Sequence, residues 1–298
     1  MDKEIPQKPV TIQYPDSWTS PIIFSSPHSG ALYPTPFVDQ SPLDLLTLRQ
    51  SEDFMVDTLF QAAPELGSPL LKANFPRAYC DPNREAYELD PDMFETPLPD
   101  YVATVSSRIS AGIGTIPKLV SRGKFIHAKP LPFAEAEHRI ETCYIPYHRA
   151  LRNLIDDATD RFDGVLLVDC HSMPSSAVAG DRPSADFVLG NRFGRSCSAA
   201  ISMQIAENLK SHGYSVAFNS PYAGGYITRK YYQPARHIHT LQIEVGRHLY
   251  MDQAALSPSD NLPVLQAHIT GLIKAIRGLC PFKQKLPSSG SSQIQAAE

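Results

Sequence analysis

The sequence lacks several features that would place it in a specialised class of protein. It has no apolar run of the roughly 18 residues that a membrane-spanning helix needs, and no apolar segment typical of a secretory signal follows its first residues. Basic residues are not in excess, since 27 Lys and Arg stand against 31 Asp and Glu, giving a net charge of −4. We therefore expect neither a membrane protein nor a dedicated nucleic-acid binder, which usually shows a strong basic excess.

Cysteine is scarce, and the common nucleophile and phosphate motifs are absent. The five cysteines are an odd number and form no C-x-x-C pair, so we expect reduced thiols and a cytoplasmic location. No G-x-S-x-G elbow and no Gly-rich phosphate loop occurs. Cys170 and His171 are neighbours on an expected strand and would point to opposite faces, which argues against a thiol nucleophile.

The composition is otherwise that of a globular protein with long irregular loops. Hydrophobic residues make up 42% of the 298 residues, charged residues 19%, and proline is frequent at 27. No internal linker divides the chain, so we predict one domain over residues 1–284. The small, polar residues 285–298 predict a disordered tail.

Short apolar runs alternate with helical stripes along the chain. The expected strands are Val10–Tyr14, Pro21–Ser26, Leu70–Asn74, Gly164–Cys170, Asp186–Leu189, Ser215–Asn219 and His239–Val245. Apolar residues spaced by three and four predict helices over Tyr144–Ile155, Ile201–Leu209 and Leu265–Ile276, and a further helix over Pro42–Ala62. This alternation predicts an α/β sandwich, in which ligands bind at the carboxyl ends of strands.

Two apolar strands end in nearly the same polar sequence. One runs into Pro27-His28-Ser29-Gly30 and the other into His171-Ser172-Met173. A histidine just beyond a buried strand is held by a rigid element, and two of them can share one zinc ion with a carboxylate or a third histidine as a further ligand. Two unrelated loop histidines would be the alternative.

Three acidic residues are candidates for that further ligand. Glu52 and Asp53 lie in a helix-like segment after His28, where they would otherwise form a solvated acidic face. Asp169 lies two residues before His171, so the two side chains share a face of the strand. Asp169 is thus either a metal ligand or an outer partner of a ligand histidine.

Further charged residues fall in polar or strand-end positions. Arg77, Asn83 and Arg84 lie in a proline-broken stretch, where arginines suit carboxylate groups or surface ion pairs. Glu244 ends an apolar strand, and a desolvated glutamate beside a metal-activated water is a suitable general base. The alternative is that Glu244 pairs with Arg247 or Arg229.

Taken together, these motifs resemble the N-formylglutamate amidohydrolase family. The segments PHSG, SEDFMVDTLF, FPRAYCDPNRE, VDCHSM, PYAGGYITRKYY and HTLQIEVGRHLYMD carry the resemblance in this order, between Pro21 and Asp252. The family is similar in fold to the zinc carboxypeptidases and aspartoacylases. The resemblance therefore implies a single-domain, three-layer α/β/α sandwich with a mixed sheet, of the phosphorylase/hydrolase-like type.

The resemblance also implies roles for individual residues. His28, Asp53 and His171 are implied to hold one zinc ion per chain, with Glu52 as the alternative to Asp53. The carboxypeptidase relatives have a glutamate three residues after the first histidine, where this chain has Ala31. Other implied roles are a general base for Glu244, carbonyl polarisation for Arg77, carboxylate binding for Asn83 and Arg84, and pocket positions for Thr228, Arg229 and His239.

The implied reaction is zinc-dependent hydrolysis of N-formyl-L-glutamate to formate and L-glutamate, a step in histidine degradation. The partner is a small carboxylated amide, for which Arg229 is expected to bind the second carboxylate. Alternatives are hydrolysis of another carboxylated amide on the same scaffold and a non-catalytic binding protein. The proline-rich residues 85–132 are expected to form a lid, and no pattern indicates an oligomeric state.

Overall fold

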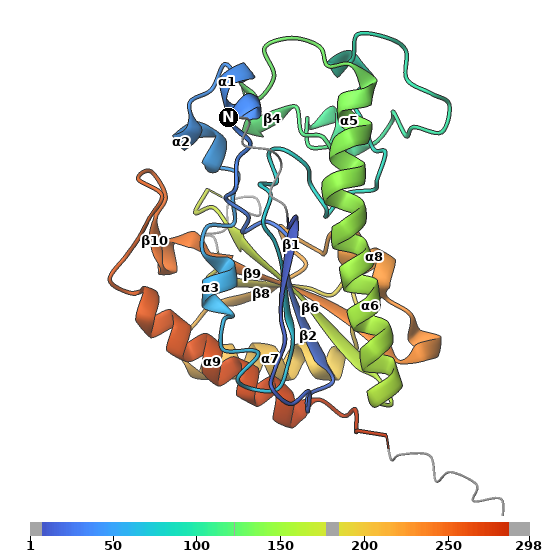
Figure 1. Ribbon diagram of the computed structural model, residues 1–298. Coiled ribbons are helices and arrows are strands. Elements are labelled where there is room, and N and C mark those ends of the chain that lie inside the picture. The colour runs from blue at the N-terminus through green and yellow to red at the C-terminus, as the bar shows by residue number, and fades with distance from the viewer. Residues whose placement is uncertain (1–7, 122, 177–184, 286–298) are drawn as a thin grey trace, which may run out of the picture.

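A mixed sheet of seven strands forms the centre of the molecule (Figure 1). The computed structural model describes residues 8–121, 123–176 and 185–285. Across the sheet the strands are β1 (Val10–Gln13), β3 (Leu70–Ala73), β2 (Ile22–Ser26), β6 (Val165–Met173), β9 (Ile238–Gly246), β7 (Phe187–Gly190) and β8 (Val216–Phe218). Neighbours run parallel except at the β1–β3 and β7–β9 pairs.

Each of the seven strands corresponds to a segment expected from the sequence. The central strand β6 is buried along all nine of its residues, as a continuous apolar run covered on both faces requires. It also extends beyond the expected end at Cys170 to Met173. This extension includes His171 in the rigid part of the sheet.

Helices cover both faces of the sheet and complete the three expected layers (Figure 1). On one face α6 (Ile145–Arg161) packs with α8 (Tyr226–Tyr231). On the other face lie α3 (Val56–Leu59), α7 (Ala199–Ser211) and α9 (Leu262–Leu279). The predicted helices in α6, α7 and α9 are confirmed.

The single helix expected over Pro42–Ala62 is wrong. The chain forms α2 (Leu45–Arg49), capped by the Asp44 carboxylate, and then α3, with an irregular stretch between them. Helical geometry stops there because Met55 adopts a left-handed φ of 55°, and the Asp53 amide donates to the His28 carbonyl at 3.0 Å instead of to its own helix. This interruption turns Asp53 toward the end of β2.

The remaining elements lie mostly above the carboxyl ends of the strands or around them. They are α1 (Thr35–Gln40), η1 (Pro91–Met93), α4 (Ser107–Ser110), β4 (Leu119–Ser121), β5 (Lys124–Phe125), α5 (Phe133–Arg139), η2 (Ile140–Tyr144), η3 (Pro234–Arg236), η4 (Arg247–Leu249), β10 (Met251–Asp252) and β11 (Ser257–Pro258). Residues 85–132 bury their own apolar side chains, including Leu89, Met93 and Ile116, and therefore pack as part of the fold. Whether they move as a lid is a prediction.

The end of the predicted domain is anchored to the body of the protein. Lys285 donates from its backbone amide to Arg161 O at 2.7 Å and from Nζ to Thr159 O at 2.6 Å. The rest of the predicted tail, 286–298, lies outside the described residues. Within the described residues, none of the helices has both the length and the apolar character needed to cross a bilayer.

Candidate active site

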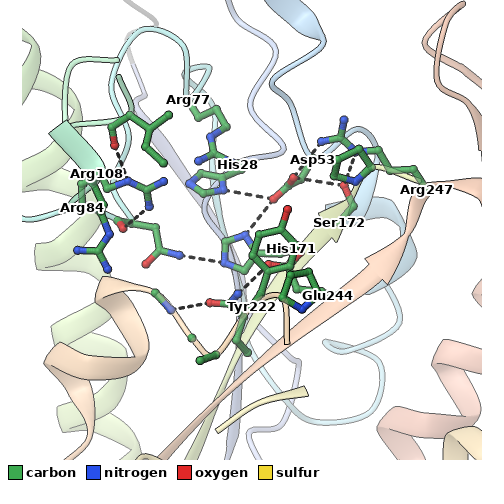
Figure 2. Close-up of a pocket in the computed structure, with 18 residues that line it drawn as sticks. His28, Asp53, Arg77, Arg84, Arg108, His171, Ser172, Tyr222, Glu244 and Arg247 are labelled. Atoms are coloured by element: carbon green, nitrogen blue, oxygen red, sulfur yellow. Dashed lines mark hydrogen bonds and ion pairs between the residues drawn. The ribbon is translucent and has the colours of Figure 1, made fainter. Parts of the chain in front are cut away.

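Three neighbouring parallel strands carry the predicted site residues to one edge of the sheet. His28 follows the last residue of β2 by two positions, and His171 lies near the end of β6. In the register of β6 and β9, His171 stands directly opposite Glu244. Figure 2 shows these side chains converging with Asp53 on one cavity, at the edge where ligand sites of such sheets occur.

The structure brings together the three predicted metal ligands. Asp53 Oδ2 lies 3.2 Å from His28 Nδ1 and 2.9 Å from His171 Nδ1. The candidate ligand atoms all lie within 4.8 Å of one another, and the three residues are buried. Two imidazoles and a carboxylate are a usual ligand set of catalytic zinc.

Two further carboxylates, those of Asp81 and Asp169, orient the two imidazoles. His28 Nε2 lies 2.8 Å from Asp81 Oδ1, and His171 Nε2 lies 2.9 Å from Asp169 Oδ2. Because a carboxylate accepts the Nε2 proton of each ring, Nδ1, which lies beside Asp53, is the nitrogen that can bind a metal once it is deprotonated. The donor set therefore fits a zinc ion. Of the two roles expected for Asp169, its position fits that of an outer partner of His171 and not that of a metal ligand. The role of Asp81 was missed, although Asp81 lies in the FPRAYCDPNRE segment that carries the resemblance.

Asp53 is fixed in its ionised form. Its Oδ1 accepts from the Ser172 hydroxyl at 3.2 Å and lies 3.3 Å from Arg247 Nη2. Burial alone would raise the pKa of Asp53, but hydrogen bonds and charge from His171 and His28 outweigh this and hold the pKa well below its ordinary value. Asp53 therefore offers Oδ2 as an anionic ligand.

Glu52, the alternative ligand, points away from this group. Its carboxylate accepts two hydrogen bonds from Arg49, at 3.0 and 3.2 Å. Burial raises the pKa of Glu52, while the Arg49 guanidinium acts against that shift. The side chains of the adjacent residues Glu52 and Asp53 therefore point in different directions. The sequence alone could not decide which of the two faces the histidines.

Glu244 has the surroundings of a general base. Its Oε1 accepts from Gln242 Nε2 at 2.7 Å. Burial raises the pKa of Glu244 to about 7; the charge of His171 acts against this shift and that of Asp53 adds to it. The expected alternative pairs are not formed, because Arg247 bonds to Ser172 and Asp53, and Arg229 to Glu85. A carboxyl group that titrates near neutrality can both accept and return a proton.

Arg77, Asn83 and Arg84 line a cavity of about 340 Å³ beside these residues. The Asn83 carboxamide lies 3.2 Å from His171 Nε2, and its Oδ1 accepts from the Ile227 amide at 2.8 Å. Arg77 Nη2 donates to Asp81 Oδ2 at 2.7 Å. The predicted carbonyl-polarising and carboxylate-binding residues are therefore next to the candidate metal ligands.

The structure does not place Thr228, Arg229 or His239 among the residues that line the cavity. The Thr228 hydroxyl donates to Gly225 O at 2.8 Å, and Arg229 forms an exposed ion pair with Glu85. His239 stacks on the Phe282 ring near the start of β9, about 16 Å of strand away from Glu244. These three pocket assignments are therefore corrected.

The sequence indicated some other residues of the cavity only weakly or not at all. Tyr222 and Gly225 belong to the Gly-rich loop of residues 221–229, within the PYAGGYITRKYY segment, and they line the cavity. Arg247 follows the end of β9 and was considered only as a partner of Glu244. Arg108 also lines the cavity, but it lies within the 85–132 segment and no motif marks it.

Comparison with known proteins gives a consistent result. A sequence model of the family described as N-formylglutamate amidohydrolase matches residues 20–251. Proteins named N-formylglutamate deformylase from Pseudomonas aeruginosa and Pseudomonas putida are each 30% identical, over 79% and 78% of this chain and 84% and 82% of theirs. A crystal structure described as N-formylglutamate amidohydrolase from Ralstonia eutropha JMP134 superposes with a TM-score of 0.86 at 36% identity, covering 91% of this chain and 97% of that one. A gene product of Agrobacterium tumefaciens, 17% identical with a TM-score of 0.65 over 91% and 93% of the two chains, shares the fold.

Proposed function

Because the chain belongs to the N-formylglutamate amidohydrolase family, we propose that it hydrolyses N-formyl-L-glutamate to formate and L-glutamate in a zinc-dependent reaction. The observation that carries this proposal is the buried group of His28, Asp53 and His171 directly beside Glu244. A base next to a metal-ligand set is the arrangement that metal-assisted amide hydrolysis needs.

In this proposal His28, Asp53 and His171 hold one zinc ion per chain. When bound, zinc supplies Lewis-acid stabilisation of a carbonyl oxygen and makes a water molecule more acidic. Asp81 and Asp169 keep each Nε2 protonated and each Nδ1 available. Arg247 and Ser172 keep the Asp53 carboxylate in a single orientation.

Glu244 is the proposed proton carrier. It takes a proton from the attacking water as the carbon–oxygen bond forms, and then delivers a proton to the amide nitrogen as the carbon–nitrogen bond breaks. The elevated pKa of Glu244, about 7, supports both steps at neutral pH. Gln242 donates to Oε1 of Glu244 and so orients this carboxyl group, which lines the cavity.

The arginines are proposed to stabilise charge on the substrate. Arg77 lines the cavity and lies near His28, because both side chains bind Asp81. Arg77 is therefore suited to stabilise the negative charge that develops on the carbonyl oxygen. Asn83 and Arg84 bind the α-carboxylate, which is one carbon from the reacting amide nitrogen.

A direct test measures metal content and turnover together. The protein is purified without chelator, its metal is quantified, and formate release from N-formyl-L-glutamate is measured before and after chelation. One zinc per chain with turnover that chelation removes and zinc restores supports the proposal. Zinc without formate release rejects the substrate, and absence of both metal binding and turnover after zinc addition favours a non-catalytic binding protein.

The cellular location is proposed from the thiols. All five cysteines are free, and four of them are buried. Free thiols are the expected state in a reducing compartment, which supports a cytoplasmic enzyme.

A further inference from the structure

Among the residues that the structure describes, four arginines and two carboxylates line the cavity. The arginines are Arg77, Arg84, Arg108 and Arg247, and the carboxylates are Asp53 and Glu244. Burial lowers the pKa of Arg84, and the charges of Arg77 and Arg108 act in the same direction. A cavity with this excess of positive charge favours a ligand with more than one negative charge.

Three of these arginines are held in place by hydrogen bonds to the protein. Arg247 donates to Ser172, to Gln50 O at 3.1 Å and to Asp53. Arg84 donates from Nε to Ile113 O at 2.7 Å and from Nη1 to Asn83 O at 2.8 Å. Arg77 is bound to Asp81. These contacts fix the orientation of the three guanidinium groups and occupy part of their donors.

Arg108 is different because its guanidinium is only loosely held. Its nearest charged partner is Glu88, with Nη1 and Oε2 3.6 Å apart, a separation longer than a hydrogen bond. Within residues 8–121, 123–176 and 185–285, no hydrogen bond to its side chain is found. Glu88 is buried and also accepts from the Ser106 hydroxyl, so Arg108 is steered by a fixed anion while its other donors remain available.

The position of Arg108 suits the more distant carboxylate of the substrate. Asn83, which is in contact with His171, marks the part of the cavity next to the reacting amide. Arg84 follows it, and Figure 2 shows Arg84 and Arg108 together on the side of the cavity away from Asp53 and Arg247. In N-formyl-L-glutamate the side-chain carboxylate is two carbons farther from the amide nitrogen than the α-carboxylate.

We infer that Arg108 binds the side-chain carboxylate and selects acidic N-formyl amino acids over neutral ones. This inference rests on the proposed function. The segment 85–132 then acts as a specificity element, since it supplies Arg108 and also the Ile113 carbonyl that positions Arg84.

Three substrates separate the two carboxylates of the natural one. N-formyl-L-glutamate has both, N-formyl-L-glutamine has only the α-carboxylate, and 4-formamidobutyrate has only the distal one. We expect Arg108→Gln to lower kcat/KM about 100-fold for the first and the third, mainly through KM, as loss of a charge-assisted pair does. For N-formyl-L-glutamine the change should stay below about threefold, and Arg108→Lys should restore part of the loss.

Arg192→Gln is the matched control. Arg192 carries the same charge near Arg108 but does not line the cavity, so its loss reports only long-range electrostatics. A change below about threefold on all three substrates is expected. Similar losses in the two variants would overturn the inference, because they would show a general field effect.

Other outcomes also decide the matter. An equal loss of Arg108→Gln on all substrates would indicate a structural role, and a loss confined to N-formyl-L-glutamine would assign Arg108 to the α-carboxylate; either overturns the inference. If the wild type released no formate, the proposed function would fail.

Calorimetric binding of N-formyl-L-glutamate tests the role of Arg108 without turnover. The two proteins compared are zinc-loaded Glu244→Gln with and without Arg108→Gln. Weaker binding in the double variant supports the inference, and equal binding overturns it.

Discussion

At the scale of single residues, the site depends on how each carboxylate is partnered. Asp53 and Glu52 are neighbours, yet one faces two imidazoles and the other faces Arg49. Asp81 and Asp169 bind the outer nitrogens of the same imidazoles. Carboxylates that look alike in the sequence therefore serve as a metal ligand, as an outer partner of a ligand histidine or as a structural anion, depending on their contacts.

Replacing the proposed base should remove turnover but not the metal. Glu244→Gln keeps the shape and the hydrogen bond to Gln242 but cannot carry the proton, so we expect kcat to fall by about 10²–10⁴-fold with unchanged zinc content. Formate release and metal analysis on the same sample are the measurements. Glu207→Gln, an exposed site on α7, is the control and should behave as wild type. Full turnover in Glu244→Gln would show that another group takes the proton.

Metal affinity should distinguish Asp53 from Glu52. Asp53→Ala removes a charged ligand and should abolish tight zinc binding, whereas Glu52→Gln breaks only the pair with Arg49 and should leave the zinc affinity within about threefold. Asp81→Asn should lower the affinity by about 10–100-fold, as expected for the outer partner of a ligand histidine. Competition with a chromophoric chelator measures all three. Tight zinc binding by Asp53→Ala would move the ligand elsewhere.

At the scale of elements, the sequence predicted what depends on local pattern. The seven strands and the helices α6, α7 and α9 follow from apolar runs and stripes. The break between α2 and α3 did not, because apolar spacing continues through it. The left-handed φ of Met55 and the long-range bond from the Asp53 amide to His28 O interrupt the helix. His239 was misassigned because its motif also contains Glu244, although the strand separates the two.

The Gly-rich loop should tolerate no side chain at Gly225. Its amide donates to Gln242 Oε1 at 2.7 Å, and a Cβ there would fall on the Asn83 carboxamide. We expect Gly225→Ala to displace Asn83 and raise KM for N-formyl-L-glutamate about tenfold, while zinc content is kept. Gly271→Ala in α9, where a Cβ meets no atom within 4 Å, is the control. Unchanged kinetics in Gly225→Ala would mean that Asn83 does not contact the substrate.

The packing of α6 on α8 should make the fold sensitive to acid. His148 accepts at Nδ1 from the Tyr231 hydroxyl at 2.8 Å and donates from Nε2 to Pro82 O at 2.9 Å. Burial, together with the charges of Lys230 and Arg152, lowers the pKa of His148 from 6.5 to about 3. The unfolded chain therefore binds a proton below about pH 6.5 that the folded protein excludes, and stability is lost as the pH falls from there toward 3.

Urea unfolding at several pH values checks this expectation. Each fully shifted histidine contributes a slope of up to about 1.4 kcal/mol per pH unit. His148→Gln should be less stable near neutrality, yet its stability should fall less steeply with acid than that of the wild type. Both proteins are measured in the presence of chelator, so that metal release does not contribute. Parallel curves would show that the folded protein protonates His148 as readily as the unfolded chain does.

At the scale of the whole molecule, the candidate metal centre joins parts of the chain that are far apart in the sequence. His28 follows β2, Asp53 lies in the break before α3, and His171 is on β6. The sequence identified these residues because each lies in its own local motif. It gave no sign of Arg108, because a proline-rich segment carries no periodicity and its approach to the cavity depends on long-range packing.

Since all three proposed ligands must be in their folded positions at once, zinc should bind the native state far better than the unfolded chain and stabilise it by mass action. With free zinc at about 100 times Kd, the gain is about 2.7 kcal/mol, which for a chain of this size corresponds to a rise of a few degrees in Tm. Thermal unfolding with zinc and with chelator measures it. His171→Ala should unfold at the same temperature in both conditions, because Asp169 then faces no imidazole and the two remaining ligands, His28 and Asp53, no longer form a tight site. A zinc-dependent Tm in His171→Ala equal to that of the wild type would place the stabilising ion outside the group of His28, Asp53 and His171.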